Sequence, residues 1–182
     1  MPTLGRRTPH AQNRSKITMP IIAKFDIDKL FTEVYKKVDM ITAAVEEALQ
    51  MVCLEIVQKA KTEYGTGNPS QAGHPHQPNY IEWTHYLKGS IGYVVYNDGE
   101  KIAEHFDGGG GKGNDGVAKG QQLAEQVASN YPMGFVAVMV AGAEYAAYVE
   151  SKGYDVLTGA TSEASGILKK YLQIAVEEIN KA

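Results

Sequence analysis

The chain has 182 residues, a net charge of -3 at neutral pH and 43% hydrophobic residues. This length fits one domain with tails and leaves no room for a second large catalytic domain. Its single cysteine, Cys53, excludes an internal disulfide and a thiolate zinc site, so packing or assembly must stabilise the fold. The sequence contains no run of about 18 apolar residues and no apolar secretory signal, so we expect a protein made in a cytoplasm, without a membrane partner.

Residues 1–25 predict a flexible, basic leader. Residues 1–18 contain no acid and four basic residues, Arg6, Arg7, Arg14 and Lys16, whereas 14 basic and 21 acidic residues follow them. Such a tail could contact nucleic-acid phosphate or an acidic partner. The alternative is a disordered or spurious leader, because Met19 could serve as a second translation start.

Apolar residues recur at spacings of three and four between residues 26 and 64, which predicts one long amphipathic helix. Asp26 or Asp28 can cap it, and the glycines and proline after Tyr64 end it. Its length would be roughly 55 Å at 1.5 Å per residue. A helix longer than the domain is wide must protrude, bend or pack on another chain, so both a bent core helix and a helix shared with a subunit interface remain open.

The middle of the chain predicts an antiparallel sheet. Residues 65–80 hold three prolines and three glycines and predict an irregular loop. Residues 90–96 and 100–106 have strand composition and flank the turn sequence Asn97-Asp98-Gly99, which predicts a hairpin. Residues 135–141 are apolar on both alternating faces, which favours the centre of the sheet.

The remaining segments complete an α+β pattern. Residues 107–120 contain seven glycines and predict a mobile loop, followed by a short helix from Gln121 to Tyr131. A last helix is predicted after Thr161 or Ser162 as its cap. The fold class is therefore α+β, with a long N-terminal helix and a C-terminal helix packed on a small, mainly antiparallel β-sheet.

The glycine-rich stretch 108–116 is the strongest candidate for a ligand site. Residues 111–116 match the pattern G-x-G-x-x-G, whose backbone amides can cradle phosphate. A chance match is nearly expected among so many glycines, and no strand runs straight into a helix there. A nucleotide- or S-adenosylmethionine-dependent enzyme is therefore kept as the alternative function.

Other chemistry-bearing residues predict no catalytic, cofactor or metal site. His85 and His105 could join His74 and His76 around a metal, but no acid lies between Gly65 and Ile81. Cys53 has apolar neighbours and no adjacent base, as expected of a core residue. Tyrosine is frequent, with 11 residues against 4 phenylalanines, which suits either an assembly surface or half-buried strands.

The long helix that closes with Ala60-Lys61, two later segments and the closing helix resemble the tail-component family of long-tailed bacteriophages. Residues 84–91, Thr-His-Tyr-Leu-Lys-Gly-Ser-Ile, are similar to the family's T-G-x-L-x-x-S-I turn, with His85 in place of the usual glycine. Residues 145–150, Tyr-Ala-Ala-Tyr-Val-Glu, are similar to its Y-A-x-Y-V-E segment, although Ser151-Lys152-Gly153 follows instead of the usual aromatic residue and glycine. The glycine-rich stretch and the residues up to Pro132 look like an insertion.

This resemblance implies a structural role without catalysis. It implies a phage or prophage virion assembly protein of the neck, a tail-completion protein that joins the head connector to the tail. Its expected partners are further copies in a ring and other neck and tail proteins, with assembly in the host bacterial cytoplasm. The candidate interface residues are Tyr145, Tyr148 and Glu150. A toxin-like or other small interaction module remains a third possibility.

Overall fold

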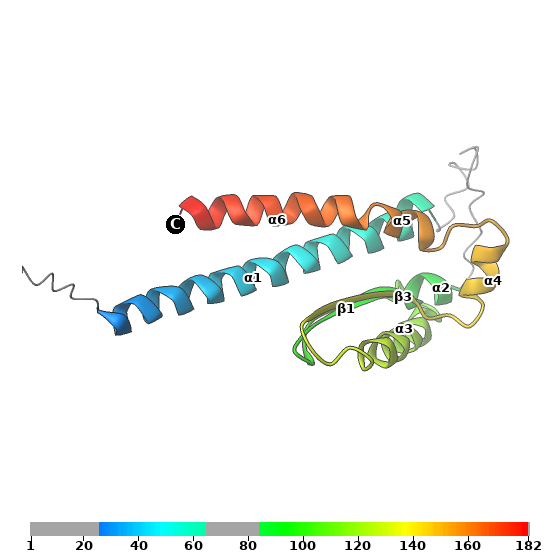
Figure 1. Ribbon diagram of the computed structural model, residues 1–182. Coiled ribbons are helices and arrows are strands. Elements are labelled where there is room, and N and C mark those ends of the chain that lie inside the picture. Colours follow the sequence, from blue (N-terminus) through cyan, green and yellow to red (C-terminus); the bar gives the residue numbers. More distant parts are fainter. Residues whose placement is uncertain (1–25, 65–83, 182) are drawn as a thin grey trace, which may run out of the picture.

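The computed structural model describes residues 26–64 and 84–181 and has the predicted α+β fold (Figure 1). Its layers follow one another as helix α6, helix α1, a three-stranded sheet and helix α3. The predicted leader 1–25 and the predicted loop 65–80 lie outside the described residues.

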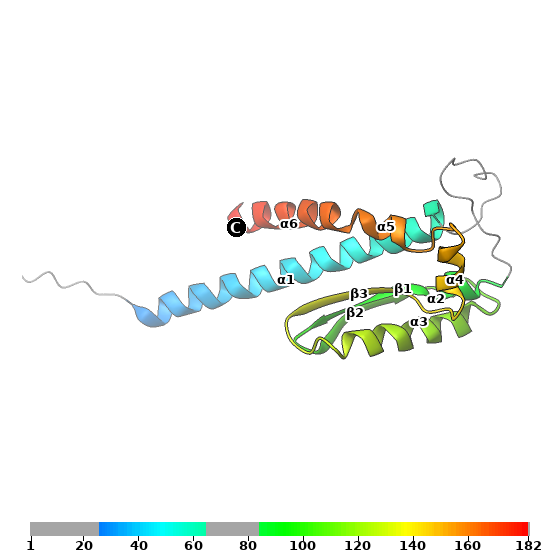
Figure 2. The ribbon, with the colours of Figure 1, turned by 45° about the vertical axis from the view of Figure 1, so that its right-hand side comes forward.

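Helix α1 spans Ile27–Lys59 and continues into a π-helical turn, η1, at Ala60–Tyr64. Asp26 caps it as predicted, because its carboxylate accepts a hydrogen bond from the Lys29 amide at 3.1 Å. Only the C-terminal half of α1 contributes buried residues, which are Ala48, Val52, Cys53, Ile56 and Val57. The N-terminal half extends beyond the sheet, which is one of the three arrangements that the length of the helix allowed (Figure 2).

Strands β1 (Ile91–Asn97) and β2 (Glu100–Phe106) form the predicted hairpin. Asp98 and Gly99 both have positive φ, at 49° and 81°, as a two-residue type I′ turn requires. Strand β3 (Phe135–Ala141) pairs antiparallel with β1, giving the order β2-β1-β3.

The prediction that residues 135–141 form the sheet centre is wrong. Strand β1 is central, and Ile91, Val94 and Val95 in it are fully buried. Strand β3 lies at an edge but contacts both α1 and α3. The sequence of β3 is apolar because a helix covers each of its two faces. An edge strand can be covered in this way even though it pairs with only one other strand.

Helix α3 spans Gly113–Ala128, so the predicted loop 107–120 is too long and the helix predicted at Gln121 begins eight residues earlier. Gly113, Gly116 and Gly120 are helical and buried, although glycine normally disfavours a helix. A loop was predicted because the composition of this segment is rich in glycine. The helix forms instead because these glycines allow close contacts with other parts of the chain, which composition does not show.

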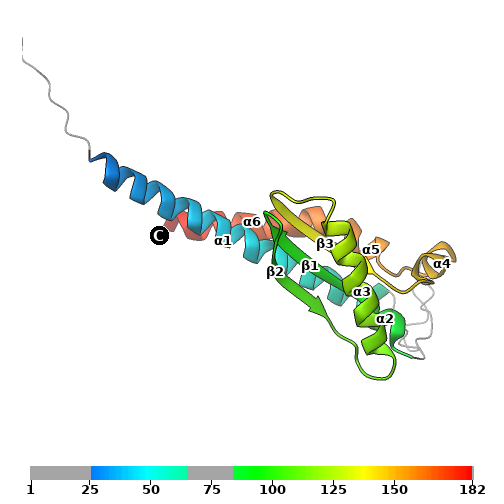
Figure 3. The ribbon, with the colours of Figure 1, turned by 90° about the horizontal axis from the view of Figure 1, so that it is seen from below.

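Four further helices complete the fold. Helix α2 (Tyr86–Ser90) precedes β1, α4 (Ala146–Ser151) follows β3, and α5 (Thr158–Ser162) leads into α6 (Ala164–Lys181). Thr161 and Ser162, the predicted caps, belong to α5 instead. Figures 1 and 3 show α6 running back along α1, where the Tyr171 hydroxyl donates to the Glu55 carboxylate at 3.2 Å. None of the helices in the described ranges combines the length and apolarity needed to cross a bilayer.

Candidate interaction surfaces

The two segments that resemble phage tail components lie side by side. The Ser90 hydroxyl is fully buried, donates to the Leu87 carbonyl at 2.8 Å and accepts from the Ala143 amide at 3.0 Å. The Gly142 amide donates to the Ser90 carbonyl at 3.1 Å. Residues about 50 positions apart in the sequence thus form one unit, which we call the junction (residues 84–91 and 142–150).

His85 occupies its position in the junction with a left-handed backbone, φ 60° and ψ 7°. Glycine adopts this conformation without strain, and other residues do so uncommonly. The backbone at this position is therefore one that glycine would favour.

Gly116 and Gly120 allow α3 to lie directly against the junction, and Gly113 lies against the residues just before α3. A Cβ atom built on Gly116 would stand 2.0 Å from the Tyr86 carbonyl oxygen, and one on Gly120 would stand 2.5 Å from that of Ser90. A Cβ on Gly113 would overlap the carbonyl of Gly108 at 1.5 Å. These glycines are occupied by contacts with the chain's own backbone, which leaves no space for a phosphate at those three positions.

The exposed rim of the junction carries a polar cluster that sequence analysis did not find. The Tyr86 hydroxyl donates to the Glu144 carboxylate at 2.7 Å, and the Lys119 ammonium lies 3.0 Å from the same carboxylate. The hydrogen bond between Tyr86 and Glu144 is the largest of the causes that raise the pKa of Tyr86 to about 12 and lower the pKa of Glu144 to about 2, and the Lys119 ammonium lowers the pKa of Glu144 further. Only the packing of the two segments and of α3 against one another brings these three groups together.

The predicted interface residues separate into two kinds. Tyr145 and Tyr148 are exposed, at 41% and 64%, near one another at the start of α4. The Tyr145 ring stacks on Tyr86 with centroids 6.1 Å apart. Glu150 instead accepts hydrogen bonds from the amides of Val156 and Leu157, at 2.9 and 3.2 Å. Its carboxylate therefore holds the connection between α4 and α5, while the two tyrosines are accessible to a partner.

A second surface runs along the exposed half of α1. Large apolar side chains there are between 48% and 65% exposed; they are Ile27, Leu30, Phe31, Val34, Tyr35, Val38 and Ile41. We call residues 27–41 the α1 arm. Apolar side chains this exposed and this contiguous are typical of an interaction surface rather than of scattered surface residues.

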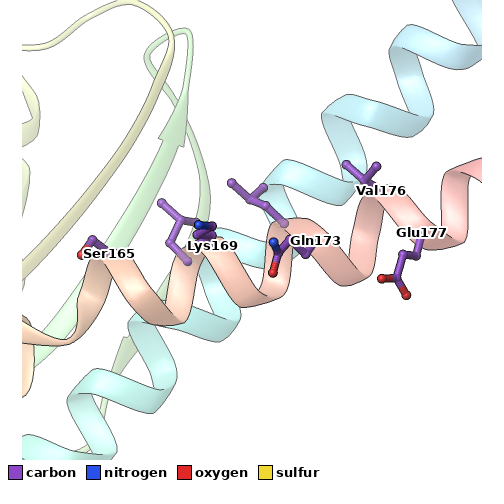
Figure 4. A pocket seen from close by; sticks show the side chains of 7 residues that line it. Ser165, Lys169, Gln173, Val176 and Glu177 are labelled. Carbon is purple, nitrogen blue, oxygen red and sulfur yellow. The ribbon is translucent and has the colours of Figure 1, made fainter.

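Helix α6 adds an apolar strip of its own. It is a shallow, open face of this one helix, where Val176 is 55% exposed (Figure 4). Leu168 and Leu172 on the same face are half-buried. Ser165, Lys169, Gln173 and Glu177 complete this face. The polar residues alternate with the apolar ones, so this strip is less continuous than the α1 arm.

The other candidate residues do not gather into a metal-type cluster among the described residues. No group of three histidine, cysteine or acidic residues suitable for a metal occurs in residues 26–64 and 84–181, and His74 and His76 lie outside these ranges. The His105 ring lies 6.0 Å from the Tyr93 ring. Cys53 is buried, and burial raises the pKa of its thiol to about 12, so it remains protonated at neutral pH.

Comparisons with protein-family models, with curated proteins and with solved structures give no match to this chain. The residues and contacts of the chain itself are therefore the basis for assigning its function.

Proposed function

We propose that the protein is a structural virion assembly protein of a phage or prophage, which joins the head connector to the tail as a ring subunit. The observation that carries the proposal is the junction. Residues 84–91 and 142–150, which resemble two separate motifs of the tail-component family, pack on each other through buried Ser90. The two motif-like segments thus form one packed unit, as we expect if this chain has the same fold as the tail-component family.

The exposed residues of the junction support a binding role. Tyr145 and Tyr148 present large rings to solvent, and tyrosine contributes much contact area at a low entropy cost on binding. The α1 arm presents further apolar area away from the junction. Two such surfaces on one small domain suit a subunit with more than one neighbour in an assembly.

The alternative, a nucleotide- or S-adenosylmethionine-dependent enzyme using residues 108–116, has weaker support. Two of its glycines, Gly113 and Gly116, lie against carbonyl groups of Gly108 and Tyr86. Their lack of a side chain is explained by helix packing, so no ligand is needed to explain it.

Deletion of the gene from the phage or prophage that carries it tests the proposed function. We expect electron micrographs to show separate heads and tails, and we expect the wild-type gene supplied in trans to restore joined particles. Mass spectrometry of purified complemented particles should detect the chain. Normal infectious particles from the deletion strain would contradict the proposal.

Tyr148→Ala in the complementing gene tests the surface within that experiment. We expect fewer joined particles, because the variant removes an exposed ring beside the junction without touching the core. Tyr131→Ala is the matched control, since Tyr131 is similarly exposed at 60% but follows the opposite end of α3. Equal loss of joining in both variants would remove the argument that this particular surface binds a neighbour.

A further inference from the structure

We infer that the α1 arm packs against the α1 arm of a second copy of this chain. This inference rests on the proposed assembly function and adds the surface through which two copies meet. It follows from the spacing, charge, area and position of the exposed apolar residues on α1.

The spacing of the arm is that of a helix-pairing seam. Ile27, Phe31, Val34, Val38 and Ile41 are separated by four, three, four and three residues, which is the alternation of core positions in a heptad repeat. Val45, Ala48 and Val52 continue the same alternation into the half of α1 where buried residues begin. The apolar residues of the arm thus continue the same row of apolar residues that is buried in the C-terminal half of α1, but on the arm they are exposed.

The charges of the arm permit it to meet a copy of itself. Residues 27–41 contain three acidic and three basic side chains, so the arm has no net charge and two arms have no net repulsion. No charged residue occupies a core position of the heptad. Four of the six, Lys29, Glu33, Lys36 and Asp39, occupy outer positions that stay solvated in a pair of helices.

The area of the arm is sufficient for a specific interface. Its seven large apolar side chains together expose on the order of 700 Å², against roughly 800 Å² contributed by each partner in an interface of standard size. Leu30 and Tyr35 flank the seam and widen it. Tyrosine, the residue type of Tyr35, is enriched among the residues that contribute most binding energy in protein interfaces.

Within the described residues, the chain's own helix α6 does not reach the arm. Ala44, Glu47, Ala48 and Met51 of α1 line one groove with Tyr171, Ile174, Ala175 and Glu178 of α6. Because the helices run antiparallel and α6 ends at Lys181, the N-terminal end of α1 continues past the end of α6 (Figure 2). Among the described elements, the arm is left for a partner to cover.

Disulfide cross-linking with introduced cysteines tests the pairing directly. The only native cysteine, Cys53, is buried with a protonated thiol, so an introduced cysteine on the arm is the reactive one. We expect Val34→Cys to give covalent dimers under mild oxidation at least tenfold faster than Lys36→Cys, its control on the outer face of the same turn. Equal rates for the two variants would overturn the inference.

A second cysteine position gives the direction of pairing. Ile27→Cys should cross-link as readily as Val34→Cys if the two arms are parallel, and much more slowly if they are antiparallel about the middle of the arm. Either pattern supports the inference, provided that Val34→Cys exceeds Lys36→Cys. Both cysteines replace exposed side chains, so folding, checked by circular dichroism, should be unaffected.

A charge placed in the seam provides an independent readout. Val34→Glu should weaken self-association on the order of a hundredfold or more, because pairing would bury an uncompensated carboxylate. Thr32→Glu, on the outer face, should associate as the wild type does.

A wild-type chain that stays monomeric would overturn the inference and point to a different protein as the occupant. Detection of that monomeric chain in virions would leave the proposed function intact, whereas cross-linked arms in a chain absent from virions would refute the proposed function alone.

Discussion

The junction and the α1 arm differ in how their residues are packed. At the junction, the glycines of α3 have no side chain, so the backbone of α3 lies in contact with the backbone of the junction. A Cβ atom on Gly116 would come within 2.0 Å of a carbonyl oxygen. On the arm, large apolar side chains project into solvent with 48% to 65% of their area exposed. The difference indicates that the stability of the single chain resides around the sheet, while the arm is available for association.

The largest expected effect compares two isoleucines of the same helix. Ile56→Ala should lower the free energy of unfolding by about 2 to 5 kcal/mol, because Ile56 is fully buried and its truncation leaves a cavity. Ile41→Ala should change it by less than about 0.5 kcal/mol, since Ile41 is half exposed. Urea denaturation at concentrations low enough to keep the chain monomeric measures both. Similar losses in the two variants would mean that the arm is packed within one chain.

A glycine pair gives the next largest effect. Gly116→Ala should destabilise the fold by about 3 kcal/mol, because the added methyl group would overlap the Tyr86 backbone. Gly166→Ala, in α6 with open space around it, should stabilise the fold by about 0.5 to 1 kcal/mol through helix propensity. Thermal unfolding of the two variants should therefore shift in opposite directions. A stabilised Gly116→Ala variant would contradict close backbone packing at the junction.

These two comparisons also mark what sequence reasoning could reach. Local signals predicted the Asp26 cap, the length of α1, the hairpin around Asn97-Asp98-Gly99 and the α+β class. They failed for α3, because its glycines are favoured only by contacts with residues far away in the chain. They also failed for the order of the strands, since an apolar edge strand covered on both faces has the same composition as a central one.

The interaction surfaces were predicted in part. The exposure of Tyr145 and Tyr148 agrees with an interface, although whether they bind a partner stays a prediction, and the Glu150 carboxylate is held by amides within the chain. The cluster of Tyr86, Lys119 and Glu144 was missed, because its members come from three separate segments. The apolar spacing of the arm was visible in the sequence, but only the end of α6 at Lys181 shows which part of it lacks cover from that helix.

Ser90→Ala is expected to have a smaller effect than the glycine variant. It should cost about 1 to 2 kcal/mol, because the buried amide of Ala143 would lose its hydrogen-bond acceptor. Ser129→Ala, which removes an exposed hydroxyl bonded to the Gln126 carbonyl, should cost less than about 0.5 kcal/mol. Chemical denaturation separates them. Equal costs would mean that Ser90 does not hold the two motif segments together.

The smallest expected effect concerns pH at the exposed rim of the junction. The pKa of Glu144 lies at about 2, below its usual 4.5, so its ionised form stabilises the fold above pH 4.5. That contribution should fade as the pH falls from 4.5 toward 2. Tyr86→Phe removes the hydroxyl that donates to Glu144, so the pKa of Glu144 should rise toward 4.5 in an NMR titration of its side chain. An unchanged titration in Tyr86→Phe would show that this hydrogen bond does not set the pKa.

Sedimentation equilibrium of the wild-type chain and of Val34→Glu, over a wide range of concentrations, tests the central claim most directly. The single chain has a mass of 19.8 kDa. The account predicts that the wild-type mass rises to a multiple of this value with concentration, while Val34→Glu remains at 19.8 kDa over the same range. A wild-type chain that stays at 19.8 kDa throughout, or a Val34→Glu variant that associates equally well, would contradict it.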